Sequence, residues 1–196
     1  MIDIVFPKGN EAEFIKIAKR LGYEGLCFVY SSKDFKSGKI KLDLKIKYGG
    51  IVSENSIKEL KNLRSKTDAV LVECKDKTRQ VIEQNKNAIV FGFENDTQRD
   101  FIHQRRSGLN HIMCNLATKN NIKVGLSFNC LLNASDRKRN ILIGRMMHNI
   151  KLCRKYKTKI VIGSFASKPY EMRPYNDLTA FFSTLGLHPS EAKGSL

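Results

Sequence analysis

The stretch KVGLSFNCLLNASDRKRNILIGRMMHNIKLCRKYKTKIVIGSF, residues 123–165, decides the fold that this sequence predicts. It begins and ends with short apolar runs, KVGLSF (123–128) and KIVIGSF (159–165), of the length and composition typical of buried strands. The long run between them, residues 136–156, predicts a helix. A strand, a helix and a second strand in this order form the unit from which a parallel sheet covered by helices is built.

The same alternation extends outward to both ends of the chain. Further strands are predicted at 2–6, 25–30, 40–52, 69–74, 88–93 and 99–103, and further helices at 11–22, 53–66, near 77–85, 108–120 and 176–185. Seven or eight such units favour a closed barrel over an open doubly wound sheet. No G-x-G-x-x-G follows the first strand, which argues against a dinucleotide-binding fold. We therefore predict an α/β fold in which residues 1–196 form one domain, a single TIM-barrel-like (β/α) barrel with a parallel sheet.

The composition is that of a folded protein, with 41% hydrophobic and 28% charged residues. No apolar run approaches the ~20 residues that a membrane span needs, and the N-terminus does not resemble a secretory signal. The five cysteines are an odd number and widely spaced, which favours reduced core thiols in a cytoplasmic protein over a disulfide framework.

Basic residues concentrate in the second half of the chain. Residues 97–196 hold 17 basic and 5 acidic side chains, a net charge of +12, within a total of +16. Self-repulsion of this size tends to destabilise a compact state. A polyanionic partner is therefore expected, and nucleic acid is the commonest one. Solvated lysines or an anionic lipid surface are the alternatives.

Two predicted helices begin with basic clusters. Arg105 and Arg106 precede Ser107, which we expect to cap the helix over 108–120, and Arg137, Lys138 and Arg139 follow a cap at Ser135 or Asp136. Cations at a helix N-terminus oppose the helix dipole, so an anion such as phosphate is expected beside them. A third cluster, Lys168 and Arg173, follows the last strand, where barrels often bind phosphate.

A catalytic centre is harder to assign. His111 and Cys114 are three residues apart, but a zinc site needs three or four ligands, so we interpret Cys114 as a packing residue. The helix after Ser107 should bury the face formed by Leu109, Ile112, Met113, Leu116 and Ala117. Strand-associated carboxylates could bind magnesium, and the candidates are Asp3, Asp43, Glu73 and Glu94. They form no recognisable constellation with a histidine, so no catalytic or metal-binding residue is predicted.

The ordered set of motifs resembles one family. RRSGLNHIMCNLATKNNIKVGLSFN (105–129), the basic helix segment GRMMHNIKLCRKYK (144–157) and the MRPYNDL segment (172–178) are similar to the archaeal ribonuclease P protein component 3, the counterpart of the eukaryotic 30-kilodalton subunit. The resemblance implies a barrel related to the polymerase and histidinol phosphatase phosphoesterases. The H-x-H motif of that related group is absent from IDIVFPKG (2–9).

The resemblance also implies an assembly. Its members support a catalytic RNA that removes the 5′ leader of precursor tRNA, and they pair with the Pop5-like protein component 2 and other ribonuclease P proteins. Magnesium would then act at the RNA, with no cofactor on the protein and no membrane partner. The expected RNA contacts are Arg105, Arg106, Arg137, Lys138, Arg139, Arg145, Lys168 and Arg173. The alternative is a stand-alone metal-dependent phosphoesterase or endonuclease on a barrel fold.

Overall fold

The computed structural model describes residues 1–31, 44–52, 62–74, 77–96, 99–100, 102–103 and 105–193. These residues contain a seven-stranded sheet in which every neighbouring pair of strands is parallel and the strands follow chain order. The strands are β1 (Ile2–Val5), β2 (Gly25–Ser31), β3 (Lys45–Val52), β4 (Ala69–Glu73), β5 (Ile89–Phe91), β6 (Lys123–Ser127) and β7 (Ile160–Gly163).

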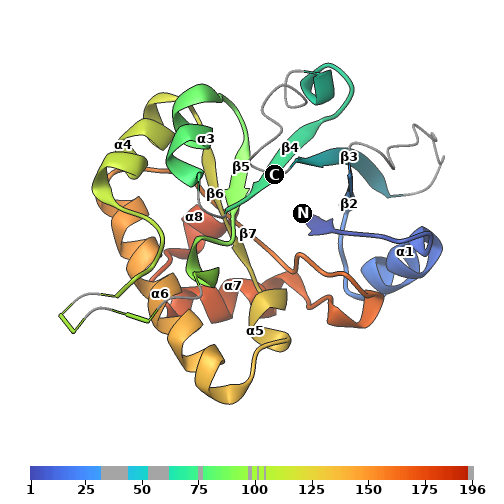
Figure 1. The fold of residues 1–196 in the computed structure, drawn as a ribbon. Coiled ribbons are helices and arrows are strands. Elements are labelled where there is room, and N and C mark those ends of the chain that lie inside the picture. The colour runs from blue at the N-terminus through green and yellow to red at the C-terminus, as the bar shows by residue number, and fades with distance from the viewer. Residues whose placement is uncertain are drawn as a thin grey trace.

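Helices lie on the described connections between strands and cover the outside of the sheet (Figure 1). They are α1 (Glu11–Arg20), α3 (Thr78–Gln84), α4 (His111–Lys119), α5 (Asn129–Leu132), α6 (Asp136–Lys155), α7 (Tyr175–Thr184) and α8 (Pro189–Lys193), with 3-10 turns η1 (Phe93–Asn95) and η2 (Pro169–Glu171). In Figure 1, α3, α4 and α6 lie on one side of the molecule and α1 lies on the other. The prediction of a TIM-barrel-like α/β fold is confirmed.

The barrel interior is filled by the inward-facing side chains of the strands, as the alternation of a strand requires. Phe91 of β5 is joined there by two rings that follow strands: the centroid of Phe165, after β7, lies 5.1 Å from that of Phe91, and Phe6, after β1, lies 6.1 Å from it. Gly125 of β6 makes room for these rings, because a Cβ atom there would lie 2.8 Å from Cβ of Phe91 and 3.1 Å from the ring of Phe165. A second, larger apolar layer lies between the sheet and the helices.

The ring of strands closes between β1 and β7 by an unusual seam. The backbone joins there through one bridge, between Val5 and Ala166. Below this bridge, the carboxylate of Asp3 takes the place of ladder hydrogen bonds. Its Oδ1 accepts from the backbone N–H of Ser164 at 2.8 Å, and its Oδ2 accepts from the Ser164 hydroxyl at 2.6 Å. The strand acid that the sequence offered as a candidate metal ligand thus serves to close the barrel.

Some element predictions need correction. No strand forms among the described residues of 99–103, which lie in the loop between β5 and α4. Of the helix expected over 53–66, residues 62–64 are helical and 53–61 lie outside the described residues. The start of the strand expected at 40–52 also lies outside them, as does Asp43. Gly22 follows the end of α1 with φ +75, as expected for a glycine that terminates a helix.

Candidate nucleic-acid interface

The loops that follow β5, β6 and β7 carry most of the basic side chains selected from the sequence. In a parallel barrel these loops lie together at the carboxyl end of the strands, where functional sites of this fold are found. Arg105 and Arg106 lie in the β5–α4 loop, and Arg137 to Arg139 begin α6, which follows β6 and the short helix α5. Lys168 and Arg173 follow β7.

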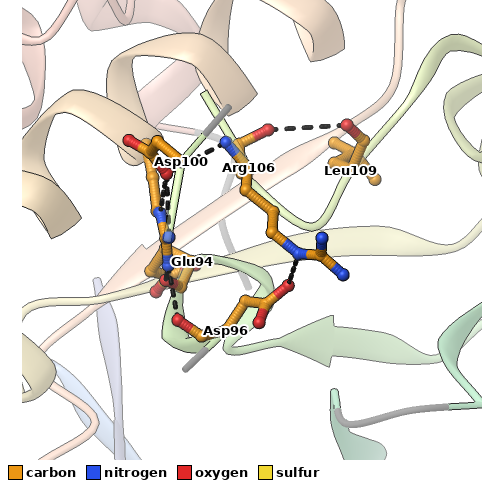
Figure 2. Close-up of polar contacts among 7 residues, drawn as sticks. Glu94, Asp96, Asp100, Arg106 and Leu109 are labelled. Carbon is orange, nitrogen blue, oxygen red and sulfur yellow. Dashed lines mark hydrogen bonds and ion pairs between the residues drawn. The ribbon is translucent and has the colours of Figure 1, made fainter. Parts of the chain in front are cut away.

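The described part of the β5–α4 loop is fixed by four charged residues that we call the Asp100 cluster: Asp96, Asp100, Arg106 and Arg145. Figure 2 labels the first three of them. The carboxylate of Asp100 accepts from the backbone N–H of Arg106 at 3.0 Å and from Nη2 of Arg145 at 2.8 Å. Nε of Arg106 donates to Asp96 at 2.5 Å. Burial acts to raise the pKa of Asp100, but the hydrogen bonds from Arg145 and Arg106 outweigh it and lower that pKa.

Arg145 has a structural role in place of the RNA contact expected from the sequence. Its side chain is only 3% exposed, so it cannot reach an external phosphate in this fold. Besides Asp100, Nη1 of Arg145 donates to the carbonyl oxygens of Glu94 at 3.0 Å and Asp96 at 2.6 Å. A buried guanidinium is tolerated where carboxylate and carbonyl acceptors satisfy its fork of donors. Arg145 therefore fastens the β5–α4 loop to α6.

Helix α4 begins later than predicted. Its N-cap is Asn110, whose side-chain oxygen accepts from the backbone N–H of Met113 at 2.9 Å. Ser107 was the expected cap. It is instead buried, and its carbonyl oxygen accepts from Nδ2 of Asn149 in α6. Gly108 has φ +77 and passes so close to the backbone of Phe93 that no Cβ fits. Arg105 and Arg106 therefore precede the helix and do not oppose its dipole.

Arg105 lies across α6 at Gly144. A Cβ atom at Gly144 would overlap the Arg105 guanidinium, so the glycine lets a long side chain lie against the helix backbone. Glycine inside a helix costs about 0.5–1 kcal/mol relative to alanine. The contact with Arg105 explains why glycine occupies this helical position despite that cost. The Arg105 residue as a whole stays exposed.

The start of α6 matches the prediction, with Ser135 as the N-cap. Arg137 and Lys138 are exposed, and no hydrogen bond or ion pair joins either side chain to another described residue. Arg139 is tied inward, because its Nε donates to the carbonyl of Leu131 at 3.0 Å and its Nη2 to that of Ala134 at 2.9 Å. Arg139 thus holds the turn between α5 and α6.

The loop after β7 also holds one exposed cation and one cation that binds the backbone of its own chain. Lys168 is exposed. Nη1 of Arg173 donates to the carbonyl oxygens of Tyr170 and Met172, at 2.9 and 2.8 Å, and its guanidinium lies 6.0 Å from the ring centroid of Phe128. Exposed and inward-tied cations therefore alternate around the carboxyl end of the barrel.

Buried acids near this end do not form a metal site among the described residues. Glu94 is fully buried in η1, its Oε2 has no hydrogen-bond partner among the described residues, and burial raises its pKa to about 7. Asp3 is also buried, which raises its pKa to about 6. Across the described ranges, no three His, Cys, Asp or Glu side chains are placed to hold a metal ion.

His111 and Cys114 occupy different environments. His111 is exposed, and its ring lies 6.4 Å from that of Tyr156. Cys114 is fully buried, as a packing residue should be. Its sulfur hydrogen-bonds with that of Cys153, which lowers the pKa of Cys114 and raises that of Cys153. All five cysteines are free thiols.

Sequence reasoning missed the residues that arrange the basic loops, namely Asp96, Asp100 and Asn149. The one available signal was Gly144 beside Arg145 in the middle of a helix, where glycine is unfavourable without a close contact.

No helix formed by the described residues has the length and apolar character needed to cross a membrane.

The fold and the basic loops define a class: a parallel (β/α) barrel with a cationic surface at the carboxyl end of its strands. Comparisons with known proteins identify the family within this class. The model of the family "RNase P subunit p30" matches residues 7–196. The chain belongs to this ribonuclease P subunit family.

Relatives agree with this assignment, and a solved structure shares the fold. The chain is 30% identical to Ribonuclease P protein component 3 of Methanococcus maripaludis strain C6, an alignment that covers 89% of this chain and 78% of the relative. It is 27% identical to the same component of Methanocaldococcus jannaschii, covering 94% and 82%. A chain in a cryo-EM structure of archaeal ribonuclease P with mature tRNA has the same fold, with a TM-score of 0.79 and 24% identity over 98% of this chain and 85% of that one.

Proposed function

We propose that this protein serves ribonuclease P by binding RNA phosphates at the carboxyl end of its barrel, while the RNA of the particle cleaves the 5′ leader from precursor tRNA. As a ribonuclease P subunit, the chain is part of a ribonucleoprotein holoenzyme that processes tRNA. The observation that carries the proposed role is the set of exposed cations on adjacent loops, Arg105, Arg137, Lys138 and Lys168.

The cations divide into two groups with different roles. Arg106, Arg139, Arg145 and Arg173 bind carbonyl or carboxylate oxygens of the chain itself. They therefore hold the loops in shape. Arg137 and Lys138 keep their charge directed outward at the positive end of a helix dipole, where backbone N–H groups and side-chain cations can bind the same phosphate.

The remaining parts of the proposal rest on membership of the ribonuclease P subunit family. The Pop5-like component 2 and other ribonuclease P proteins are the proposed protein partners, and magnesium is proposed to act at the RNA. The five free thiols support the reducing cytoplasm as the compartment. The alternative, a stand-alone phosphoesterase, gains no support from the described carboxylates, because Asp3 is engaged by Ser164 and Glu94 is buried.

A salt titration tests the phosphate contacts. The variant Arg137→Gln with Lys138→Gln should bind ribonuclease P RNA more weakly and with a shallower dependence of log affinity on log salt concentration. The slope should decrease by roughly 0.7–0.9 for each phosphate that the variant no longer neutralises. The effect should be similar for RNAs of different sequence, because phosphate contacts position a protein without reading bases.

The matched control is Lys16→Gln with Arg20→Gln, which removes the same charge from exposed positions of α1. Parallel salt plots for wild type and the Arg137/Lys138 variant would contradict the proposed contacts. Equal slope changes in both variants would show that only the total charge matters.

A further inference from the structure

A groove runs along the outer side of α6 toward the turn between α7 and α8. Its volume is about 450 Å³, and its lining includes Gly144, Met147, Lys151, Arg154, Leu185 and Gly186. It is separate from the loops that carry Lys138 and Lys168. Of the exposed cations assigned to RNA above, only Arg105 lines it.

The groove is filled at one of its two glycines and open at the other. Gly144 lacks a side chain in one wall, which Arg105 covers with its guanidinium. Gly186 lies in the opposite wall with φ +103, and the nearest atom to a Cβ there would be Cγ2 of Ile150 at 4.0 Å. Between them, Met147, Ile150 and Leu185 supply apolar surface. A hollow of this kind fits an apolar side chain of a binding partner.

The charged groups at the groove are mostly cations. Arg105, Lys151 and Arg154 line it, and α6 as a whole carries seven basic residues and one acidic residue. Arg154 is held in place by Glu191 of α8, with Nε 3.3 Å from the carboxylate, and by the carbonyl of Gly186. Lys151 is exposed. The occupant should therefore carry negative charge beside its apolar group.

Exposed apolar side chains distinguish a protein occupant from RNA. The described residues include five large hydrophobic side chains that are exposed, and four of them lie on the β5–α4 loop, α4 and α6. They are Ile102 (94% exposed), Ile112 (43%), Ile141 (38%) and Met147 (47%). Ile112 was expected on the buried face of α4. Of these four side chains, Met147 lines the groove. Methionine is enriched in protein–protein contacts, whereas phosphate binding gains nothing from an apolar side chain.

We propose that the α6 groove docks a segment of another protein that carries apolar and acidic side chains. The apolar side chain enters between Gly186 and the Arg105 guanidinium that covers Gly144, and the acidic groups pair with Lys151. The proposal rests on the proposed function only in placing that partner within the ribonuclease P particle. It assigns α6 two uses, with RNA at its first turn and protein along its remaining length.

Photocrosslinking in the assembled particle tests the occupant. The variant Met147→p-benzoylphenylalanine is assembled with the purified RNA and protein components, irradiated, and analysed by mass spectrometry. The same probe at Tyr170, which is 82% exposed on η2, serves as the control position. We expect position 147 to crosslink to an acidic, apolar segment of one protein component, and position 170 not to reach that segment.

Charge reversal gives a second measurement. Lys151→Glu should weaken binding of the crosslinked component to this chain by roughly tenfold, the scale of one interface hot spot. Lys16→Glu on α1 makes the same charge change away from the groove and should leave binding within about twofold, as expected for a charge outside the contact.

Each other outcome contradicts the proposal. A crosslink from position 147 to RNA alone would assign the groove to RNA, and the absence of any crosslink in an active particle would show that the groove faces solvent. Processing of precursor tRNA by the wild-type particle, measured in parallel, tests the proposed function separately. An inactive wild-type particle would therefore count against that function and not against the groove.

Discussion

At the scale of single residues, neighbouring positions on α6 have opposite characters. Gly144 contributes only backbone and lets Arg105 lie against the helix, while Arg145 contributes a guanidinium that is buried among carboxylate and carbonyl oxygens. At Gly144 the helix leaves space for the Arg105 side chain, and at the next position Arg145 binds Asp100. Through this pair, α6 positions the loop that carries Arg105 and Arg106.

We predict that Arg145→Met destabilises the fold by about 2–3 kcal/mol, because Asp100 and two carbonyl oxygens lose a charged donor that water replaces only in part. Arg145→Lys should recover part of this loss, since an ammonium cannot reproduce the guanidinium fork. Urea unfolding monitored by circular dichroism measures both. The exposed Arg137→Met is the control and should change stability by no more than about 0.5 kcal/mol. An equally small change for Arg145→Met would show that the Asp100 cluster does not stabilise the loop.

At the scale of elements, the sequence predicted the regular parts well. The apolar runs of the strands and the caps at Gly22 and Ser135 are local signals, and the structure places them as expected. The β5–α4 loop was mispredicted because its shape depends on Arg145, which lies 45 positions from Asp100 in the sequence. The RNA-contact set was chosen by charge. Charge alone does not distinguish an exposed Lys138 from an Arg139 that binds its own backbone.

The two helix caps provide a test at this scale. Asn110→Ala should destabilise the protein by about 1 kcal/mol, because it removes the hydrogen bond to the backbone N–H of Met113. Ser135→Ala should cost less, since the side chain of Ser135 makes no capping hydrogen bond in α6. Thermal or urea unfolding of the two variants gives the comparison. A larger loss for Ser135→Ala would mean that α6 depends on its cap more than the structure shows.

At the scale of the whole molecule, two buried carboxylates make stability depend on pH. Burial raises the pKa of Asp3 from 3.8 to about 6 and that of Glu94 from 4.5 to about 7. Over that interval the folded state binds more protons than the unfolded state. The free energy of unfolding is therefore expected to fall as the pH rises from about 4 to about 7.

The variant Glu94→Gln should reduce this slope and be more stable than wild type at pH 8, because a neutral amide replaces an ionised group that is buried and only partly hydrogen-bonded. The gain is expected to be a few kcal/mol at most, since one pKa unit corresponds to about 1.4 kcal/mol. Urea unfolding from pH 4 to pH 8 measures it, with the exposed Glu13→Gln of α1 as the control. A wild-type curve that rises across this range would contradict the assigned protonation of both acids.

The seam between β1 and β7 has a consequence for how the protein is made. The partners of Asp3 and Val5 are Ser164 and Ala166, so the ring joins residues that are synthesised at opposite ends of the barrel sequence. On the ribosome, β1 can pair with β2 early, but its other edge stays unpaired until the segment after β7 has emerged. During that time the nascent sheet has an open edge of the kind that invites pairing with other chains. Closing the barrel is thus a late step of biosynthesis, because the Asp3 carboxylate meets Ser164 only after 161 further positions have been synthesised.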